Sequence, residues 1–276
     1  MIKFFRHIRQ SLLMENKTGK PALPTGRYLK YAIGEIILVV IGILIALQVN
    51  NWNQDRIAKK ETVIFLERLK QDLINEKTVL NERIKYYSKV HQHAKNVVNT
   101  LSNQSDSLGS QFLIDVYQAS QIWVYRNVRD TYDELISTGN IKLIPDKSLR
   151  KRIGLYYDET DVYMRMWYKE TNYRELARSY IPMDVQEKIR EACEVWAEID
   201  QEIGGNEIID DCRPNLTYEQ ISKSIVFLKK NKLIESNTLL IAANRHESDL
   251  YQKIGLYKRK LNGNEELLNL LDEYKQ

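Results

Sequence analysis

The chain has 276 residues, of which 43% are hydrophobic and 28% are charged. This length allows a real core in one large domain or two small ones, and only 11 glycines and 5 prolines interrupt it, which favours long helices. The formal net charge of +4 comes mostly from the first 30 residues, so the remainder lacks the block of positive charge that binds nucleic acid. We expect no DNA or RNA partner.

Residues 1–30 form a basic leader in which one acid, Glu15, stands against seven lysines and arginines. Short segments with this charge bias stay on the cytoplasmic side of a membrane. We therefore expect a cytoplasmic leader. Its cationic residues are Lys3, Arg6, Arg9, Lys17, Lys20, Arg27 and Lys30.

An apolar run at residues 32–49 follows the leader and is interrupted only by Glu35 and Gln48. As a helix, this run would be ~27 Å long, close to the ~30 Å hydrocarbon core of a bilayer. Tyr31 before the run and Trp52 after it suit the level of the lipid headgroups. The run therefore predicts a single transmembrane helix.

This prediction divides the chain into the leader (1–30), a transmembrane helix (31–51) and an extracytoplasmic domain (52–276), with a candidate sub-boundary at 103–110. Two alternatives remain open. A cleaved signal peptide would normally have a shorter apolar region and a small-residue cleavage site. A buried helix of a soluble protein is disfavoured by the basic leader. We favour the uncleaved anchor.

Glu35 lies inside the predicted span, only ~6 Å along the helix from Tyr31. An ionisable group within a membrane is costly and needs a reason. We favour snorkelling to the interface or pairing with a basic residue, ahead of recognition of another helix and of proton or ion coupling. Gly42 and Ala46 form a small-x-x-x-small pair that permits close approach of a second helix, although such pairs are common by chance.

A heptad pattern of apolar residues begins at Leu66 and predicts a helix of ~36 residues with one apolar seam. Glu76 and Arg83 interrupt the pattern, so packing within a helical bundle is favoured over a self-associating coiled coil. No helix breaker separates Trp52 from the seam, so the membrane helix can continue into it. The seam consists of Leu66, Leu73, Leu80, Tyr87, Ala94 and Leu101, with Leu69, Val90 and Val97 at companion positions.

Apolar residues recur at helical spacing along the rest of the chain, and we find no convincing alternating strand pattern. The sequence thus predicts an all-α fold, in which a transmembrane helix precedes an extracytoplasmic helical bundle. The helices are expected at 112–125, at 131–137 with Gly139 as cap, from Pro145 to Trp167, at 184–202, from the Thr217 and Gln220 capping box to Lys229, and at 239–261, where Gly263 ends the helix before a short one from Glu265.

The helix after Pro145 carries an aromatic face formed by Tyr156, Tyr163 and Trp167. This face is a candidate surface for a partner or a ligand, with Arg126 or Arg129 available to an anion. Core packing explains most such aromatic residues, so a small-molecule pocket is the less favoured use of them.

Cys193 and Cys212 are the only cysteines. In an oxidising compartment we expect them to form a disulfide, which would contribute ~3 kcal/mol in the chain-entropy description. The alternative is a pair of reduced, buried thiols. Their spacing fits neither a redox motif nor a zinc site.

The histidines are poor catalytic candidates. His91 and His93 point to different faces of a predicted helix, and His246 lies on an apolar stripe, where a hydrogen-bonded core histidine is favoured over a base. The sequence contains no phosphate-binding loop, nucleophile elbow or metalloprotease helix. We therefore expect a non-enzyme without a metal or cofactor.

Three segments carry a family resemblance: MENKTGK at 14–20, YAIGEIILVVIGILIALQVNNWN at 31–53, and residues 131–144, which contain TYDEL, STG and LI. They resemble an uncharacterised family of single-pass membrane proteins, a domain of unknown function common in Bacteroidota. The resemblance implies no activity. It implies an inner-membrane protein whose main domain lies in the periplasm of a Gram-negative cell. Residues 21–27 look like an insertion relative to that family.

Two classes of function remain. The first is an anchored interaction or scaffold module that holds a protein partner or another copy of itself, as the long seam and aromatic faces suggest. The second is a ligand-sensing bundle that signals through a partner, because ~30 cytoplasmic residues leave no room for an output domain. A hydrolase is a distant third.

Overall fold

The computed structural model describes residues 24–103, 108–167, 171–198 and 204–274. The side chains of Tyr31 and Trp167 lie outside the described residues, as does most of the leader, residues 1–23. The chain forms two compact units, Met1–Lys60 and Glu61–Gln276. Their division falls nine residues after the predicted boundary at 51/52.

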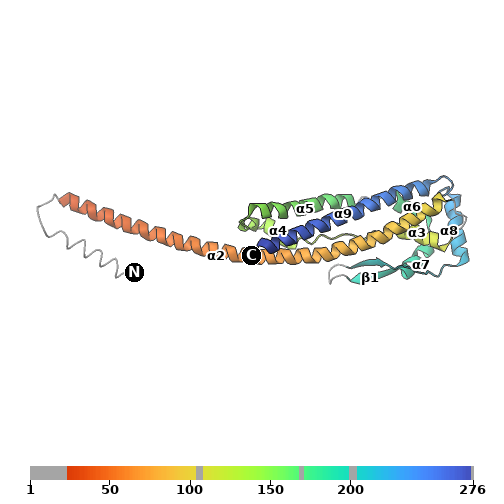
Figure 1. The fold of residues 1–276 in the computed structure, drawn as a ribbon, viewed down its shortest axis with the longest axis horizontal. Helices are drawn as coiled ribbons and strands as arrows, with labels where there is room; N and C mark the ends of the chain where they lie inside the picture. Colours follow the sequence, from red (N-terminus) through yellow and green to blue (C-terminus); the bar gives the residue numbers. More distant parts are fainter. Residues whose placement is uncertain (1–23, 104–107, 168–170, 199–203, 275–276) are drawn as a thin grey trace. The chain divides into compact units, whose positions relative to one another are not determined.

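Helices dominate both units, which confirms the all-α prediction. Figure 1 labels the main elements, coloured along the sequence. The helices are α2 (Pro24–Ser102), α3 (Ser110–Ala119), α4 (Asp130–Ser137), the 3-10 helix η1 (Asn140–Leu143), α5 (Lys147–Trp167), α6 (Asn172–Tyr180), α7 (Met183–Cys193), α8 (Tyr218–Lys230) and α9 (Thr238–Tyr274). Two antiparallel strands, β1 (Glu194–Glu198) and β2 (Gly204–Ile208), pair with Glu194 opposite Ile208.

The first unit contains the apolar part of α2. Large apolar side chains at 33–49 are between 37% and 62% exposed, so no described part of the protein buries them. This stretch is long and apolar enough to cross a membrane. The structure thus supports one candidate membrane span near the N-terminus, followed by helices.

In the second unit, the part of α2 beyond Glu61 lies beside α5 and α9 (Figure 1). These three helices bury a shared apolar core. Because each helix contributes residues three or four positions apart, each presents one apolar stripe to the other two. The core includes Leu66, Leu69 and Leu73 from α2, Leu149, Ile153, Tyr156 and Tyr157 from α5, and Leu267 and Leu271 from α9.

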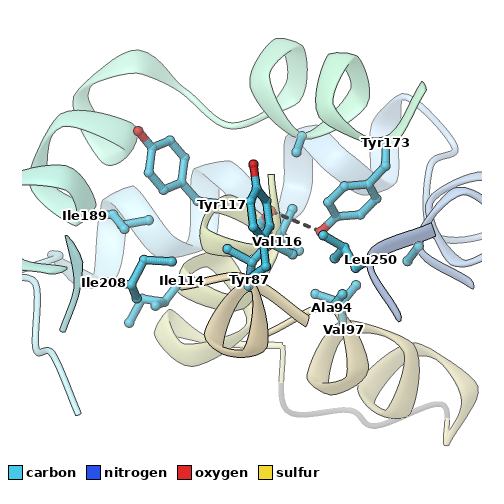
Figure 2. Close-up of a cluster of buried hydrophobic side chains, with 14 of the residues drawn as sticks. Tyr87, Ala94, Val97, Ile114, Val116, Tyr117, Tyr173, Ile189, Ile208 and Leu250 are labelled. Atoms are coloured by element: carbon cyan, nitrogen blue, oxygen red, sulfur yellow. Dashed lines mark hydrogen bonds between the residues drawn. The ribbon is translucent and has the colours of Figure 1, made fainter. Parts of the chain in front are cut away.

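A second core lies farther along α2, where α3, α6, α7 and α8 also pack. Figure 2 shows part of it: Ala94 and Val97 from α2 lie near Leu250 from α9, and the Tyr173 hydroxyl reaches the main chain of α3. That hydroxyl donates a hydrogen bond of 3.0 Å to the carbonyl oxygen of Val116. The bond satisfies a polar atom inside an otherwise apolar core.

The predicted seam of α2 is confirmed. Its members from Leu66 to Ala94 are buried, and Leu101 is half-buried. Glu76 and Arg83, the two positions that break the heptad, are also completely buried. They therefore face the interior, which requires polar partners there.

Three predicted helix ends are wrong. The helix expected to reach residue 125 ends at Ala119, because side chains on α2 instead bind the extended segment that follows: Arg83 Nη2 donates to Val124 O (3.0 Å) and Tyr87 Oη to Trp123 O (3.0 Å). The helix expected at 184–202 ends at Cys193, and the chain continues as strand β1. There, Ile209 N donates to Cys193 O at 2.8 Å, which extends the pairing of the strands.

The last helix does not stop at Gly263 but runs to Tyr274. A Cβ at this position would lie 3.6 Å from the Tyr156 ring, an ordinary van der Waals distance, so Gly263 lies where α9 packs against α5 and does not end the helix. Predicted caps are confirmed elsewhere. Gly139 has a φ of 74° after α4, and the Thr217 and Gln220 capping box begins α8.

Candidate functional site

Glu76 is the centre of a buried polar cluster that joins three helices and the segment after α3. Its carboxylate accepts hydrogen bonds from Tyr156 Oη, at 2.6 Å, and from Tyr125 Oη. Lys260 Nζ lies 3.7 Å from Glu76 Oε1 and donates to Tyr156 O at 3.1 Å. Asn264 Nδ2 also contacts Tyr156 Oη, at 3.1 Å. The cluster connects α2, α5 and α9 through polar atoms.

Burial governs the electrostatics of this cluster. It lowers the pKa of Lys260 to about 7, although the nearby Glu76 carboxylate acts in the opposite direction. Burial also raises the pKa of Tyr125 and of Tyr156 well above the ordinary tyrosine value, so both remain hydrogen-bond donors. Because the side chains of Glu76 and Lys260 are at most 1% exposed, the cluster cannot meet a substrate and acts as a structural core.

Arg83, the second interruption of the seam, binds the segment after α3. Its guanidinium carbon lies 3.6 Å from the centroid of the Trp123 ring, in a cation–π contact. Together with its hydrogen bond to Val124 O, this contact holds the extended segment against α2. Sequence reasoning noted Glu76 and Arg83 as irregular but could not assign their partners, which are 40 or more residues away.

A cleft of about 980 Å³ lies in the second unit, bounded by the segment at 120–124, the end of α5, α6 and the first half of α9. Its volume lies within the size range of ligand sites in proteins. Sequence reasoning missed it, because residues 120–124 were assigned to a helix.

The floor of the cleft is fixed by His246. Its ring stacks on Tyr173 with centroids 4.7 Å apart, and its Nε2 lies 2.8 Å from Ala119 O. Nε2 must carry the ring proton, because a carbonyl oxygen can only accept a hydrogen bond. The unprotonated Nδ1 therefore accepts a hydrogen bond from Thr171 Oγ1, at 3.0 Å. Burial lowers the pKa of His246 to about 4. The prediction of a hydrogen-bonded core histidine is confirmed.

The walls of the cleft combine positive charge with apolar surface. Its lining includes four cationic side chains, from Arg165, Arg174, Arg245 and Lys253, and one carboxylate among the described residues, from Asp249. Burial lowers the pKa of Lys253 to about 8. The apolar lining includes five side chains that are unusually exposed for their type, namely Ile122, Val124, Val162, Met166 and Ile241.

The structure does not place the predicted aromatic face at a surface. Tyr156 and Tyr163 are buried inside the domain, because α5 turns them toward the core, and the Trp167 side chain lies outside the described residues. A partner therefore cannot reach the two tyrosines in the folded domain. Arg129 is also engaged, since it forms ion pairs with Asp133 and Asp161.

Cys193 and Cys212 form a disulfide with Cα atoms 5.0 Å apart. It ties the end of α7 to the segment that follows β2. His91 and His93 lie on different faces of α2, as expected: His91 Nε2 is 2.6 Å from Glu247, and His93 Nδ1 is 2.7 Å from Asp115. Within the part of the chain that the structure describes, no three His, Cys, Asp or Glu side chains gather as a metal site.

Comparison with known proteins gives a match to a family described as "Family of unknown function (DUF6090)". The match covers residues 35–180, more than half of the chain, from the apolar part of α2 to the end of α6. No curated protein and no solved structure matches the chain.

Proposed function

The chain belongs to the family of unknown function DUF6090, and we propose that this member is a membrane-anchored interaction module of the periplasm. One observation carries the proposal: no residue in the apolar stretch of α2 is buried, while the residues from Glu61 onward form a compact unit with its own cores. Exposed apolar surface of this extent requires a bilayer or a partner to cover it.

The basic leader supports an N-terminus in the cytoplasm and a single pass through the inner membrane of a Gram-negative cell, as in Bacteroidota. The helical domain would then lie in the periplasm. The disulfide between Cys193 and Cys212 fits that compartment, because thiols oxidise there and stay reduced in the cytoplasm.

We further propose that the domain binds a protein partner or a second copy of itself and is not an enzyme. The cluster around Glu76 and Lys260 supports a structural role, because both side chains are buried and a substrate cannot reach them. The exposed apolar side chains around the cleft, such as Ile241 and Val124, are a surface that a partner can cover.

Crosslinking tests this proposal in intact membranes. A photoreactive residue replaces Ile241, which is 66% exposed beside the cleft, or Val226, which is 58% exposed on α8 and serves as the control. We expect Ile241, but not Val226, to give a reproducible protein adduct, identified by mass spectrometry. Equal adducts at both positions, or none at Ile241, would contradict a partner site beside the cleft.

A thiol reagent that cannot cross the inner membrane tests the topology at a Ser236→Cys substitution.

A ligand-sensing role is the second candidate, and the cleft favours it. Its volume of about 980 Å³ and its mixture of fixed polar atoms and apolar walls are typical of ligand sites. Signalling would then require a partner that contacts the leader or Glu35. Thermal stabilisation of the full chain by a specific metabolite supports this role, because a ligand that binds only the folded state raises its stability.

A further inference from the structure

We propose that the cleft binds a soluble aliphatic carboxylate, with the anionic head near Lys253 and Arg174 and the chain along the apolar wall. This inference rests on the ligand-sensing candidate above and names the ligand class. Three features of the cleft carry it: an excess of positive charge, a floor fixed by the hydrogen bonds of His246, and an apolar wall that has no covering in the described structure.

Positive charge lies in the part of the cleft that contains His246. Lys253 and Arg174 line the cleft together with His246, and after burial their charges lower the pKa of that ring, whereas Asp249 raises it. The charge of Lys253 is also poorly solvated, because burial is the main cause of its own lowered pKa. An anion beside Lys253 would restore the stabilisation that water no longer supplies.

The two cations have donors to spare. Arg174 Nη1 donates to Ser120 O, which leaves other N–H groups of its guanidinium free of described partners. Lys253 Nζ lies 4.6 Å from the centroid of the Tyr87 ring, and the charge of Asp249 raises the pKa of Lys253, although the described residues show no ion pair between the two. Guanidinium and ammonium groups both donate charge-assisted hydrogen bonds to carboxylates, so an anion in the cleft can use either cation.

The apolar wall of the cleft favours an aliphatic chain on the ligand. Ile122, Val124 and Ile241 come from two segments far apart in sequence, yet they line one opening and remain between 37% and 66% exposed. An aliphatic chain would remove this surface from water without leaving a polar group unpaired. Asp249, the carboxylate of the lining, disfavours a second negative charge, so a single anionic head fits better than a multiply charged one.

Calorimetric titration of the full chain in neutral nanodiscs tests the proposal, with empty nanodiscs subtracted. The probes are decanoate, decanol, which lacks the charge, and acetate, which lacks the chain. We expect decanoate to bind at least about tenfold more tightly than either of the others, since each loses one of the two contributions. Equal affinity for decanol and decanoate, or no binding of decanoate, would overturn the proposal.

Two substitutions locate the site. Lys253→Met removes the charge but keeps the aliphatic stem, and Lys258→Met on the exposed side of the same helix is its control. Ile241→Glu adds an acid at the exposed rim, where we expect folding to be undisturbed, with Val226→Glu on α8 as control. We expect both cleft variants to weaken decanoate binding about tenfold and both controls to leave it unchanged.

Other outcomes separate the sources of ligand. Unchanged decanoate binding in Lys253→Met and Ile241→Glu would place the anion elsewhere and overturn the assignment. If nanodiscs that contain anionic phospholipid compete with decanoate for binding, the ligand of the cleft is a lipid headgroup and the proposal of a soluble ligand is wrong. If decanoate fails to bind while the Ile241 adduct with a protein persists, the cleft is a protein-docking surface, and the interaction module stands without the ligand.

Discussion

Lys260 Nζ lies 3.7 Å from Glu76 Oε1 in the interior of the helical domain, where the two side chains are 1% and 0% exposed. The two residues come from helices α9 and α2, separated by most of the domain's sequence. Tyr156 and Tyr125 hold the carboxylate from its other sides. Burying an ion pair costs desolvation free energy. The hydrogen bonds that these tyrosines donate to Glu76 offset part of this cost.

Below pH 7, where Lys260 carries its proton, Lys260→Met should destabilise the domain by about 3 kcal/mol, because it leaves the Glu76 carboxylate buried without its cation. The measurement is denaturant unfolding of the full chain in detergent, followed by far-ultraviolet circular dichroism. Lys258→Met, at an exposed position two residues earlier, should change stability by less than about 0.5 kcal/mol. The double variant Glu76→Gln with Lys260→Met should lose less than the sum of the two single losses. Additive losses would show that the pair is not coupled.

The stability of the domain should rise with pH above about 7, because burial lowers the pKa of Lys260 from 10.5 to about 7. Between these values the unfolded chain holds a proton on this lysine that the folded chain has released. Folding therefore gains up to about 1.4 kcal/mol per pH unit, and the gain is lost as the pH falls to 7. Unfolding of the wild type and of Lys260→Met at several pH values checks the difference. Parallel pH profiles would contradict it.

The sequence indicated where on α2 this cluster lies, but not which residues of other helices contact it. The heptad seam of α2 was predictable because apolar spacing of seven reports which face of a helix is buried. Glu76 and Arg83 stood out within it. The partners of Glu76, namely Tyr125, Tyr156 and Lys260, lie 49, 80 and 184 residues away from it along the chain. Periodicity along one helix carries no information about which distant side chains meet it.

The cleft was not predictable for a different reason. The apolar residues at 120–125 fit a helical pattern, and only the contacts of Arg83 and Tyr87 with the main chain at 123–124 show why this segment is extended. Tertiary hydrogen bonds overrode local propensity there. The same holds for β1, where pairing with β2 ends a helix that local spacing would continue.

Replacing both cysteines by alanine should lower the stability of the domain by about 3 kcal/mol, because Cys193 and Cys212 close a loop with a sequence separation of 19. Reduction of the wild type should give the same loss. Mass tagging with a maleimide checks the bond itself. We expect the protein from intact cells to label at these residues only after reduction. Labelling without reduction would contradict both the bond and the periplasmic location.

Glu35→Leu should change the free energy of membrane insertion by less than about 1 kcal/mol, because the acid lies only ~6 Å along the helix from Tyr31 and we expect it to snorkel to the interface. The control moves the acid to the middle of the span: Gly42→Glu should cost about 3 kcal/mol. Translocon insertion of the segment at 24–60, scored by glycosylation of flanking sites, measures both. If Glu35→Leu improves insertion by as much as Gly42→Glu impairs it, the native carboxylate lies at hydrocarbon depth. Its retention there would then require a cationic or helical partner in the membrane.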